Sequence, residues 1–264
     1  MRVLNYHNHF NLGDCLFHII YCNKLLDIND NIVINFYTNK QHFDELTPFI
    51  LHNNINLLDI DLGYPDGTIN CWICRESHQK CHYGDRISKH NYYLDSFYIE
   101  FFNLLANEVG LKIDIKTNED LILNSNFISD KCIHYPQEID YLIVNSQPMS
   151  GQLESYEAND FVRLAQDLHL KGHTVVTTKC CRNLYEDEGI TKEVPGLLCT
   201  RYKELNLAEI GILSKRSKNL IAINTAPVIP CFGNNYDKFV ILDNQNKYSY
   251  KNCEHLTDVK KIIL

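Results

Sequence analysis

The chain has 264 residues, of which 45% are hydrophobic, enough for a substantial core in one large domain or two small ones. Its 25 basic and 33 acidic residues give a net charge of -8, which argues against nucleic acid as a partner. No apolar run approaches the roughly 20 residues that a transmembrane segment needs, and the N-terminus does not resemble a signal peptide. We therefore expect a cytoplasmic protein.

The first half of the chain alternates between strand patterns and helix patterns. Strands are expected at residues 2–6, 31–38 and 55–60. Helical spacing is found at residues 16–26, 41–53 and 94–110. Pro48 breaks the second of these helices, and Gly110 is suited to cap the third. The long stretch 61–91 has no regular pattern and is expected to be an irregular loop, which at this length is typical of a functional or mobile segment.

Residues 124–138 have no clear period, and we place a domain boundary there, between domains spanning 1–130 and 136–264. A second alternation follows this boundary. Strands are expected at residues 139–145, 173–178, 196–200, 219–224 and 238–243. Helices are expected at residues 157–172, 206–217 and 253–264, with Gly172 closing the first of them.

Strands that alternate with helices predict parallel sheets with helical crossovers, that is, an α/β fold. Two such runs, separated by a break, indicate two doubly wound, Rossmann-like domains. Ligands of such sheets bind beyond the carboxyl ends of the strands. Functional residues are therefore expected in the loops that lead from a strand into a helix.

The first of these loops contains Gly13 and Asp14. The glycine would permit a tight turn and a close approach of a ligand to the backbone. The aspartate has two interpretations: an N-cap of the following helix, or a general base presented to a cleft. The residues alone favour the cap.

Three further loops offer groups for a phosphate or diphosphate. Thr225, Ala226 and Pro227 follow the strand at 219–224 and could open a helix whose amides bind an anion. The small polar loop 146–155 and Lys179 each follow another strand. The loop could instead be an ordinary turn, and Lys179 could be a solvated surface charge.

The segment "CWICRESHQKCH" (71–82) could supply ligands for tetrahedral zinc, with Cys71, Cys74, Cys81 and His82 as the donors. Its CxxC spacing is suitable, but the later spacings match no zinc-finger pattern. We expect no metal there, and zinc remains the minority alternative. In a protein of the cytoplasm, most of the 11 cysteines are expected to be reduced and buried.

Four segments, in order, resemble the heptosyltransferase-like glycosyltransferases, the family of the ADP-heptose:LPS heptosyltransferases. "NLGDCLFHIIYCNKL" resembles the strand–Gly–Asp–helix element at the start of that family. "YLIVNSQP" resembles the strand that opens its second domain. "NDFVRLAQDLHLKGHTVVTT" resembles a helix followed by a GH-x-VV strand. "LNLAEIGILSKRSKNLIAINTAPVIPCFG" resembles a segment that normally contains Asp-Thr-Gly-Pro.

The resemblance implies a GT-B fold, with two facing Rossmann-like domains, an acceptor in the first and a nucleotide-sugar donor in the second. It implies inverting sugar transfer without a required metal or other cofactor, from a UDP-, GDP- or ADP-sugar to a glycan or another hydroxyl. Asp14 would be the base. The donor would contact residues of both domains: Gly13, Ser146, Gln147, Lys179, Asn224, Thr225, Ala226 and Pro227.

Three other functions stay open. Polysaccharide pyruvyl transferases also have an N-terminal Gly-Asp after a strand and a GT-B-like form. The second is a catalytically silent nucleotide- or carbohydrate-binding protein. It is compatible with three departures from the residues usual in the heptosyltransferase pattern, at Asn224, Ala226 and Ile229. The third is a zinc-dependent interaction protein built on residues 71–82.

Overall fold

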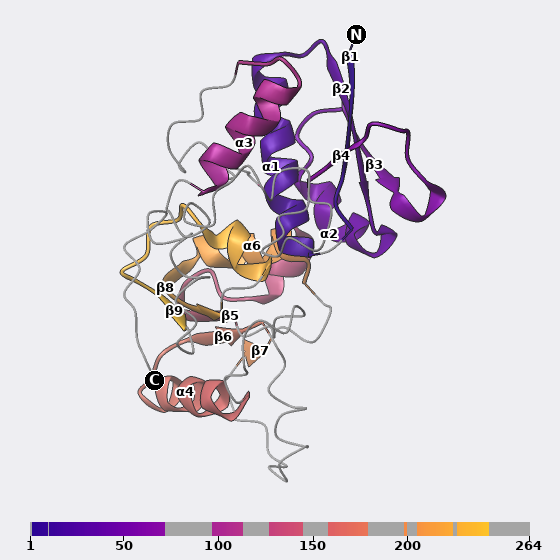
Figure 1. Cartoon of the computed structure of the whole chain (residues 1–264). Coiled ribbons are helices and arrows are strands. Elements are labelled where there is room, and N and C mark those ends of the chain that lie inside the picture. The colour runs from indigo at the N-terminus through magenta and orange to yellow at the C-terminus, as the bar shows by residue number, and fades with distance from the viewer. Residues whose placement is uncertain are drawn as a thin grey trace. The chain divides into compact units, whose positions relative to one another are not determined.

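A computed structural model describes residues 2–9, 11–71, 97–112, 127–144, 158–178, 198–199, 205–223 and 226–242. The chain divides into two compact units, Met1–Ser125 and Asn126–Leu264. Each unit contains its own parallel sheet (Figure 1). The prediction of an α/β fold with two parallel sheets is confirmed.

The first sheet has four parallel strands in the order β3-β2-β1-β4. The strands are β1 (Arg2–His7), β2 (Ile32–Thr38), β3 (Ile55–Asp59) and β4 (Ile69–Asn70). The chain runs outward from β1 to β3 and then returns to place β4 on the other side of β1. The strand order therefore reverses between β1 and β4, and such a reversal is the usual ligand-binding position of an open α/β sheet.

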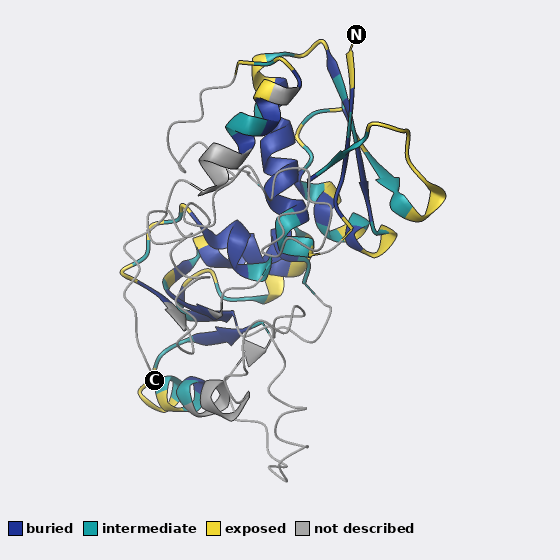
Figure 2. Ribbon diagram, in the orientation of Figure 1, coloured by how far each residue is buried: buried dark blue, intermediate teal, exposed yellow. Residues whose placement is uncertain are grey.

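Helix α1 (Leu12–Ile28) follows β1 and is buried along most of its length (Figure 2). Its Tyr21 ring stacks on Phe102 of α3 (Phe97–Glu108), with 4.6 Å between the ring centroids. Gly110 ends α3 with a positive φ of 69°, and the amides of Gly110 and Leu111 return to the last turn of the helix. This glycine is the predicted cap, because few other residues adopt that backbone conformation without strain.

The predicted helix at 41–53 is divided into three short elements. They are η1 (Lys40–His42), α2 (Phe43–Leu46) and η2 (Thr47–Phe49). Pro48 lies in the last of them, where it prevents continuation of an α-helix. The irregular segment expected at 61–91 is described only as far as Cys71, after a short turn, η3 (Ile60–Leu62). Within that part the short strand β4 was not predicted.

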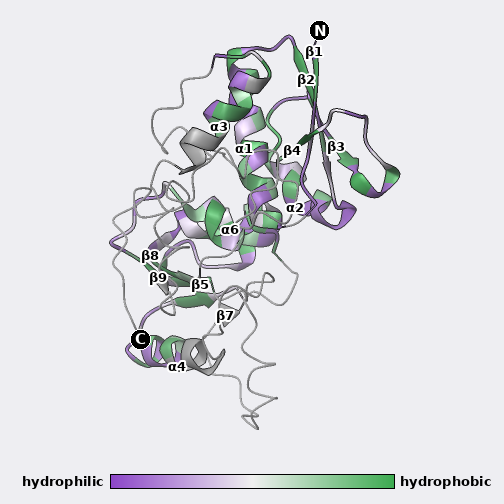
Figure 3. Ribbon diagram, viewed as in Figure 1, coloured by the Kyte–Doolittle hydropathy of each residue, from purple (hydrophilic) through white to green (hydrophobic). Residues whose placement is uncertain are grey.

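The second sheet has five parallel strands in the order β7-β6-β5-β8-β9. The strands are β5 (Ile139–Val144), β6 (Val175–Thr177), β7 (Leu198–Cys199), β8 (Ser217–Ile223) and β9 (Lys238–Leu242). All pairs are parallel, and the strand order reverses between β5 and β8. The apolar character of β5 is visible in Figure 3, as expected for a sheet with both faces covered.

Two helices of the second unit agree with the sequence patterns: α4 (Ala158–Leu170) and α6 (Leu207–Lys215). Ala165 of α4 packs into a buried cluster with Ile143 and Val175 of the sheet. Gly172 follows α4 with a φ of 88° and is the predicted cap. The helix expected at 253–264 lies outside the described residues.

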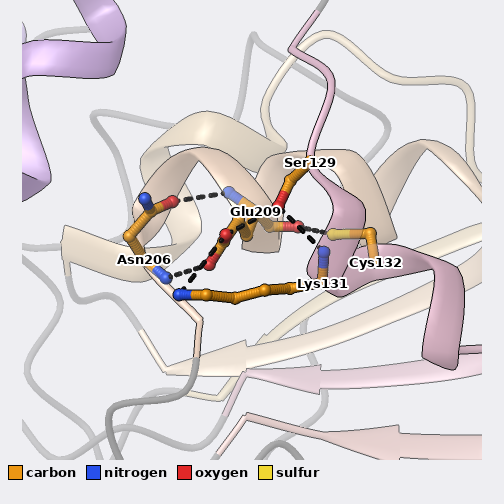
Figure 4. A network of polar contacts seen from close by, with 5 residues as sticks. All are labelled: Ser129, Lys131, Cys132, Asn206 and Glu209. Atoms are coloured by element: carbon orange, nitrogen blue, oxygen red, sulfur yellow. Dashed lines mark hydrogen bonds and ion pairs between the residues drawn. The ribbon is translucent and has the colours of Figure 1, made fainter.

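The segment that enters the second unit is held against the start of α6 (Figure 4). It forms a short turn, η6 (Asp130–His134), before β5 begins. The carboxylate of Glu209 accepts hydrogen bonds from the Ser129 hydroxyl at 2.7 Å and from the backbone amide of Asn206 at 2.8 Å. The side-chain oxygen of Asn206 accepts from the backbone amide of Glu209 at 2.9 Å, which completes a capping box. The buried Glu209 carboxylate therefore joins the entry segment to the helix.

Candidate functional site

The strand order of each sheet reverses at one position. Gly13 and Asp14 follow the strand at the first position, and Ala226 and Pro227 follow a strand at the second. In the first sheet this position lies at the carboxyl end of β1, where His7 is paired with Asn70 of β4. In the second sheet it lies at the carboxyl ends of β5 and β8, which are paired through Val144 and Ala222.

At the first edge, Asp14 lies in the opening turn of α1. Asn11 is the N-cap residue, and its carbonyl accepts the first helical hydrogen bond, from Cys15, at 3.0 Å. Asp14 is therefore the third residue of the helix, and the N-cap interpretation that the sequence favoured for it is wrong. Gly13 is the second residue of the helix and belongs to its first turn, not to a turn before it.

The Asp14 carboxyl is partly buried, and burial raises its pKa to about 6. The Asn11 amide opposes this shift as a donor, but weakly, since its Nδ2 atom lies 3.5 Å from Oδ2 of Asp14. Aspartate in a first helical turn is also favoured by the helix dipole. A carboxylate whose pKa lies near neutrality is a stronger base than an ordinary aspartate and is still ionised at pH 7, as general-base catalysis requires.

The turn that carries Asp14 is fixed by a small polar cluster beneath it. The Cys15 thiol lies 3.5 Å from the Asn8 carbonyl, 3.3 Å from the Thr38 hydroxyl and 4.0 Å from Nδ1 of His42. Burial raises the pKa of the Cys15 thiol to about 12, so it is not a nucleophile at physiological pH. These contacts attach the loop between β1 and α1 to the end of β2.

The structure adds three aromatic rings to this edge that the sequence did not indicate. His7, the last residue of β1, stacks on Tyr64 with a centroid distance of 4.5 Å and an interplanar angle of 16°. His9 lies nearly parallel to His7, at 6.3 Å and 14°. We call His7, His9 and Tyr64 the ring stack. Alternate residues at the end of a strand lie on the same face, so the sequence could have indicated that His7 and His9 are neighbours. No local pattern links them to Tyr64.

At the second edge, the chain after β8 forms a short 3-10 helix, η7 (Ala226–Cys231). Ala226 and Pro227, two of the predicted donor-binding residues, are its first two residues and are partly buried. The helix that this loop could open is thus a six-residue 3-10 helix, and Pro230 lies inside it.

Helix α6 supports η7 through a close contact at Gly211. A Cβ atom at this position would lie 3.1 Å from Cβ of Pro230 and 3.2 Å from the Pro230 carbonyl oxygen. Asn234 adds a polar connection, donating to the Ser214 hydroxyl at 2.8 Å and to the Cys231 carbonyl at 3.2 Å. The position of η7 therefore depends on a residue without a side chain in α6.

The other predicted donor-binding residues lie outside the described residues. They are Ser146, Gln147, Lys179, Asn224 and Thr225. Of the minority zinc ligands, Cys74, Cys81 and His82 also lie outside them. Cys71 is described and buried, and its backbone amide donates to the His7 carbonyl at 2.8 Å. Within the described part of the chain, no three histidine, cysteine or carboxylate side chains are grouped as a metal site would require.

Comparison with known proteins gives structural neighbours only. No family model matches the chain, and no curated protein matches it in sequence. A family 9 glycosyl transferase from Veillonella parvula has a TM-score of 0.58 and 10% identity, over 100% of this chain and 88% of that one. The E. coli heptosyltransferase WaaC with ADP has a TM-score of 0.59 and 9% identity, over 93% of this chain and 88% of that one.

The E. coli ADP-heptose LPS heptosyltransferase II is similar over 100% of this chain and 91% of its own, with a TM-score of 0.57 and 13% identity. These solved structures match across both units. The fold is GT-B. The fold that the resemblance implied is therefore confirmed, while identities this low carry nothing beyond the fold. Among the residues that the structure describes, no helix combines the length and apolar character needed to cross a bilayer.

Proposed function

We propose that this GT-B protein transfers a sugar from a nucleotide-sugar donor to a hydroxyl of a glycan or another acceptor. The proposed enzyme is a hexosyl- or heptosyltransferase, and the proposed reaction is inverting and needs no metal. The observation that supports it best is Asp14, a partly buried carboxyl group with a pKa raised to about 6 at the edge where the first sheet reverses its strand order.

In the proposed mechanism, Asp14 accepts the proton of the acceptor hydroxyl. The acceptor oxygen attacks the anomeric carbon, the bond from that carbon to the diphosphate breaks, and its electron pair leaves with the nucleoside diphosphate. Proton transfer to a positioned base contributes typically 10²–10⁴-fold. Alignment of the two substrates and stabilisation of the leaving diphosphate would supply the remainder.

The proposed donor is a UDP-, GDP- or ADP-sugar bound by the second unit. Two of the solved neighbours support a nucleotide ligand, since the E. coli heptosyltransferase WaaC was solved once with ADP and once with ADP-2-deoxy-2-fluoro heptose. In this chain the donor would contact the turn after β8, through Asn224, Thr225, Ala226 and Pro227. Ser146, Gln147 and Lys179 would complete the site.

The test begins with the donor. Calorimetric titration of the full chain with UDP, GDP and ADP, and with CMP as a control, should find one nucleoside diphosphate that binds. A bulky replacement of Thr225 should weaken that binding, whereas unchanged affinity would move the donor elsewhere. Turnover in the presence of EDTA tests metal independence. Consumption of phosphoenolpyruvate instead of any nucleotide-sugar would identify a pyruvyl transferase.

The second arm of the test removes the proposed base. Asp14→Asn should lower turnover by about a hundredfold or more and leave nucleoside diphosphate affinity nearly unchanged. Asp27→Asn is the matched control, because Asp27 lies in the same helix on the surface, where it pairs with His52 at 2.9 Å. Equal turnover in Asp14→Asn and Asp27→Asn would reject Asp14 as the base. Nucleotide binding without any turnover by the unmodified protein would identify a catalytically silent binding protein.

A further inference from the structure

The ring stack presents aromatic surface at the edge of the first sheet. The Tyr64 side chain is 46% exposed, and His9 is also exposed, while His7, which lies nearly parallel to both rings, is only 7% exposed. Tyr37 of β2 packs at 6.0 Å from Tyr64, tilted by 55°, and supports that ring from the sheet. Exposed aromatic rings grouped beside a reversal of strand order are a candidate surface for a ligand.

The position of the ring stack relative to Asp14 is fixed by the fold. His7 and His9 lie at the end of β1, and the loop that follows leads directly into the first turn of α1. The Asn39 side chain donates to the His9 carbonyl at 2.6 Å and so attaches this loop to the end of β2. His7, His9 and Asp14 therefore lie in or beside one braced loop at the point where the strand order reverses, and Tyr64 packs on His7 from the segment before β4.

A second observation points to a ligand that carries hydroxyl groups. Nδ1 of His7 is buried and has no hydrogen-bond partner among the residues that the structure describes. Buried polar atoms are normally satisfied, so this ring nitrogen, beside exposed rings, is suited to accept a hydrogen bond from a ligand. A hydroxyl that reached it after a small movement of the Tyr64 ring would donate the missing hydrogen bond.

The charges near the ring stack favour a neutral ligand over a nucleotide. The segment 55–71, which contributes Tyr64, contains Asp59, Asp61 and Asp66 but no lysine or arginine. Burial lowers the pKa of His7 to about 4 and also lowers that of His9, so both imidazoles are neutral at pH 7. A nucleotide, with its phosphates, would meet only negative charge from this segment. A neutral sugar ring meets no such penalty.

We propose that the ring stack is a carbohydrate subsite, which holds a neutral pyranose ring of the acceptor against Tyr64 and His9 with a hydroxyl directed to His7. The C–H face of a pyranose packs against the negative face of an aromatic ring, and its hydroxyls bond at the edges. This inference rests on the proposed transfer reaction and names the class of its acceptor: a glycan with an uncharged sugar at the reactive end.

The test uses the whole 264-residue chain and small probes of known chemistry. Saturation-transfer NMR with methyl β-galactoside and methyl β-glucoside should show saturation concentrated on the ring C–H protons of one sugar face. Tyr64→Ala should raise the Kd of the better glycoside by about twofold to tenfold, because one aromatic stacking contact is lost. Tyr64→Phe keeps the ring and should retain binding.

Two further variants complete the design. Leu62→Ala is the matched control, since Leu62 lies two residues away and is 85% exposed. It should bind the glycosides as the unmodified protein does. His7→Phe preserves an aromatic ring but removes the nitrogen, and it should weaken binding of the glycosides while saturation of the sugar face persists at higher ligand concentration.

The outcomes that overturn the inference are distinct from those that overturn the proposed reaction. Absence of glycoside binding, equal affinity in Tyr64→Ala and Leu62→Ala, or saturation of adenosine or uridine in preference to the glycosides would reject the carbohydrate subsite. If nucleoside diphosphates still bind in that case, the transfer reaction stands. Glycoside binding that depends on Tyr64, in a protein that binds no nucleotide, would support the subsite and reject the transfer reaction.

Discussion

The imidazole of His18 lies with Nδ1 2.6 Å from the backbone carbonyl oxygen of Asp14, one turn earlier in α1. A carbonyl oxygen only accepts, so Nδ1 donates and carries the proton. The His18 ring is 1% exposed and packs between Phe36 of β2, at 6.0 Å, and Phe102 of α3, at 5.9 Å. Thus a buried ring, held by two other elements, fixes the turn that presents the proposed base.

His18 predicts a specific dependence of stability on pH. Burial lowers its pKa from 6.5 to about 4, so the stability it provides is complete above pH 6.5 and is lost as the pH falls towards 4. His18→Phe, which preserves the ring, should cost about 0.5–1.5 kcal/mol of unfolding free energy at pH 7.5, through the lost hydrogen bond. This deficit should shrink or reverse at pH 5.

Urea unfolding at the two pH values measures both effects for His18. His52→Asn is the control, since His52 is a surface histidine that pairs with Asp27 at 2.9 Å. A deficit in His18→Phe that is the same at pH 7.5 and pH 5 would contradict the assignment of a buried, neutral imidazole.

Asp14 should behave in the opposite sense. Its folded-state pKa is raised from 3.8 to about 6, so its contribution to stability is complete below pH 3.8 and is lost as the pH rises through 6. Asp14→Asn removes this cost and should raise the Tm at pH 8, by about 2–4 °C for each kcal/mol relieved. The gain should vanish near pH 4, and a variant less stable than the unmodified protein at pH 8 would contradict it.

The same group should set the acid limb of the rate profile. If Asp14 is the base, kcat/KM should rise with pH through an apparent pKa near 6, because the protonated carboxyl cannot accept a proton. Measurement of initial rates from pH 5 to 8 checks this expectation. A profile that is flat across that range would exclude a base with this pKa.

The sequence predicted most of the fold because the apolar spacing of its elements is local. The hydrophobic periodicity of β2 and α1 can be recognised from neighbouring residues. Gly110 and Gly172 mark two helix ends because glycine readily adopts the positive φ found there. Strand β4 escaped prediction because its two residues are too few for any period, and its pairing to β1 depends on contacts across the sheet.

The candidate site was predictable only in part, for the same reason. Asp14 is a candidate because it follows a strand, and its role as a base stays a prediction. Its cap interpretation is wrong, since the choice between Asn11 and Asp14 as the N-cap depends on where the helix begins. Tyr64 comes next to His7 through the return of the chain to β4, which no local pattern indicates. Gly211 looked like an ordinary helical residue, and its role appears only when Pro230 is placed against it.

Whether Gly211→Ala raises or lowers the stability of the second unit tests the contact between α6 and η7. In an unobstructed helix, Gly→Ala stabilises by roughly 0.5–1 kcal/mol. Gly211→Ala should instead destabilise the second unit, because its Cβ would lie 3.1 Å from Pro230 and displace η7 by a few tenths of an ångström. It should also weaken nucleoside diphosphate binding if the donor contacts η7.

Thermal unfolding and calorimetry measure the two effects of Gly211→Ala, with Lys215→Ala, at the exposed end of α6, as the control for helix propensity. A more stable Gly211→Ala protein would show that η7 accommodates the methyl group. Lower stability with unchanged nucleotide affinity would separate the packing contact from the proposed donor site.

Glu209 should be essential to the stability of the second unit, because its carboxylate is 6% exposed and satisfies donors from two segments. Oε1 accepts from the Ser129 hydroxyl at 2.7 Å and lies 3.7 Å from Nζ of Lys131, while Oε2 accepts from the Asn206 amide at 2.8 Å. Glu209→Gln replaces one acceptor oxygen by a donor that faces another donor. We expect a loss of about 1–3 kcal/mol of unfolding free energy.

Ser129→Ala removes only one donor to the same carboxylate and should cost less than Glu209→Gln, about 0.5–1.5 kcal/mol. Glu138→Gln is the matched control, since that carboxylate is 85% exposed and its ion pair with Lys218 spans 3.8 Å. Urea unfolding of the three variants should therefore rank Glu209→Gln as the least stable and Glu138→Gln as unchanged. If Glu209→Gln and Glu138→Gln unfolded at the same urea concentration, the entry segment would not depend on this carboxylate for its attachment to α6.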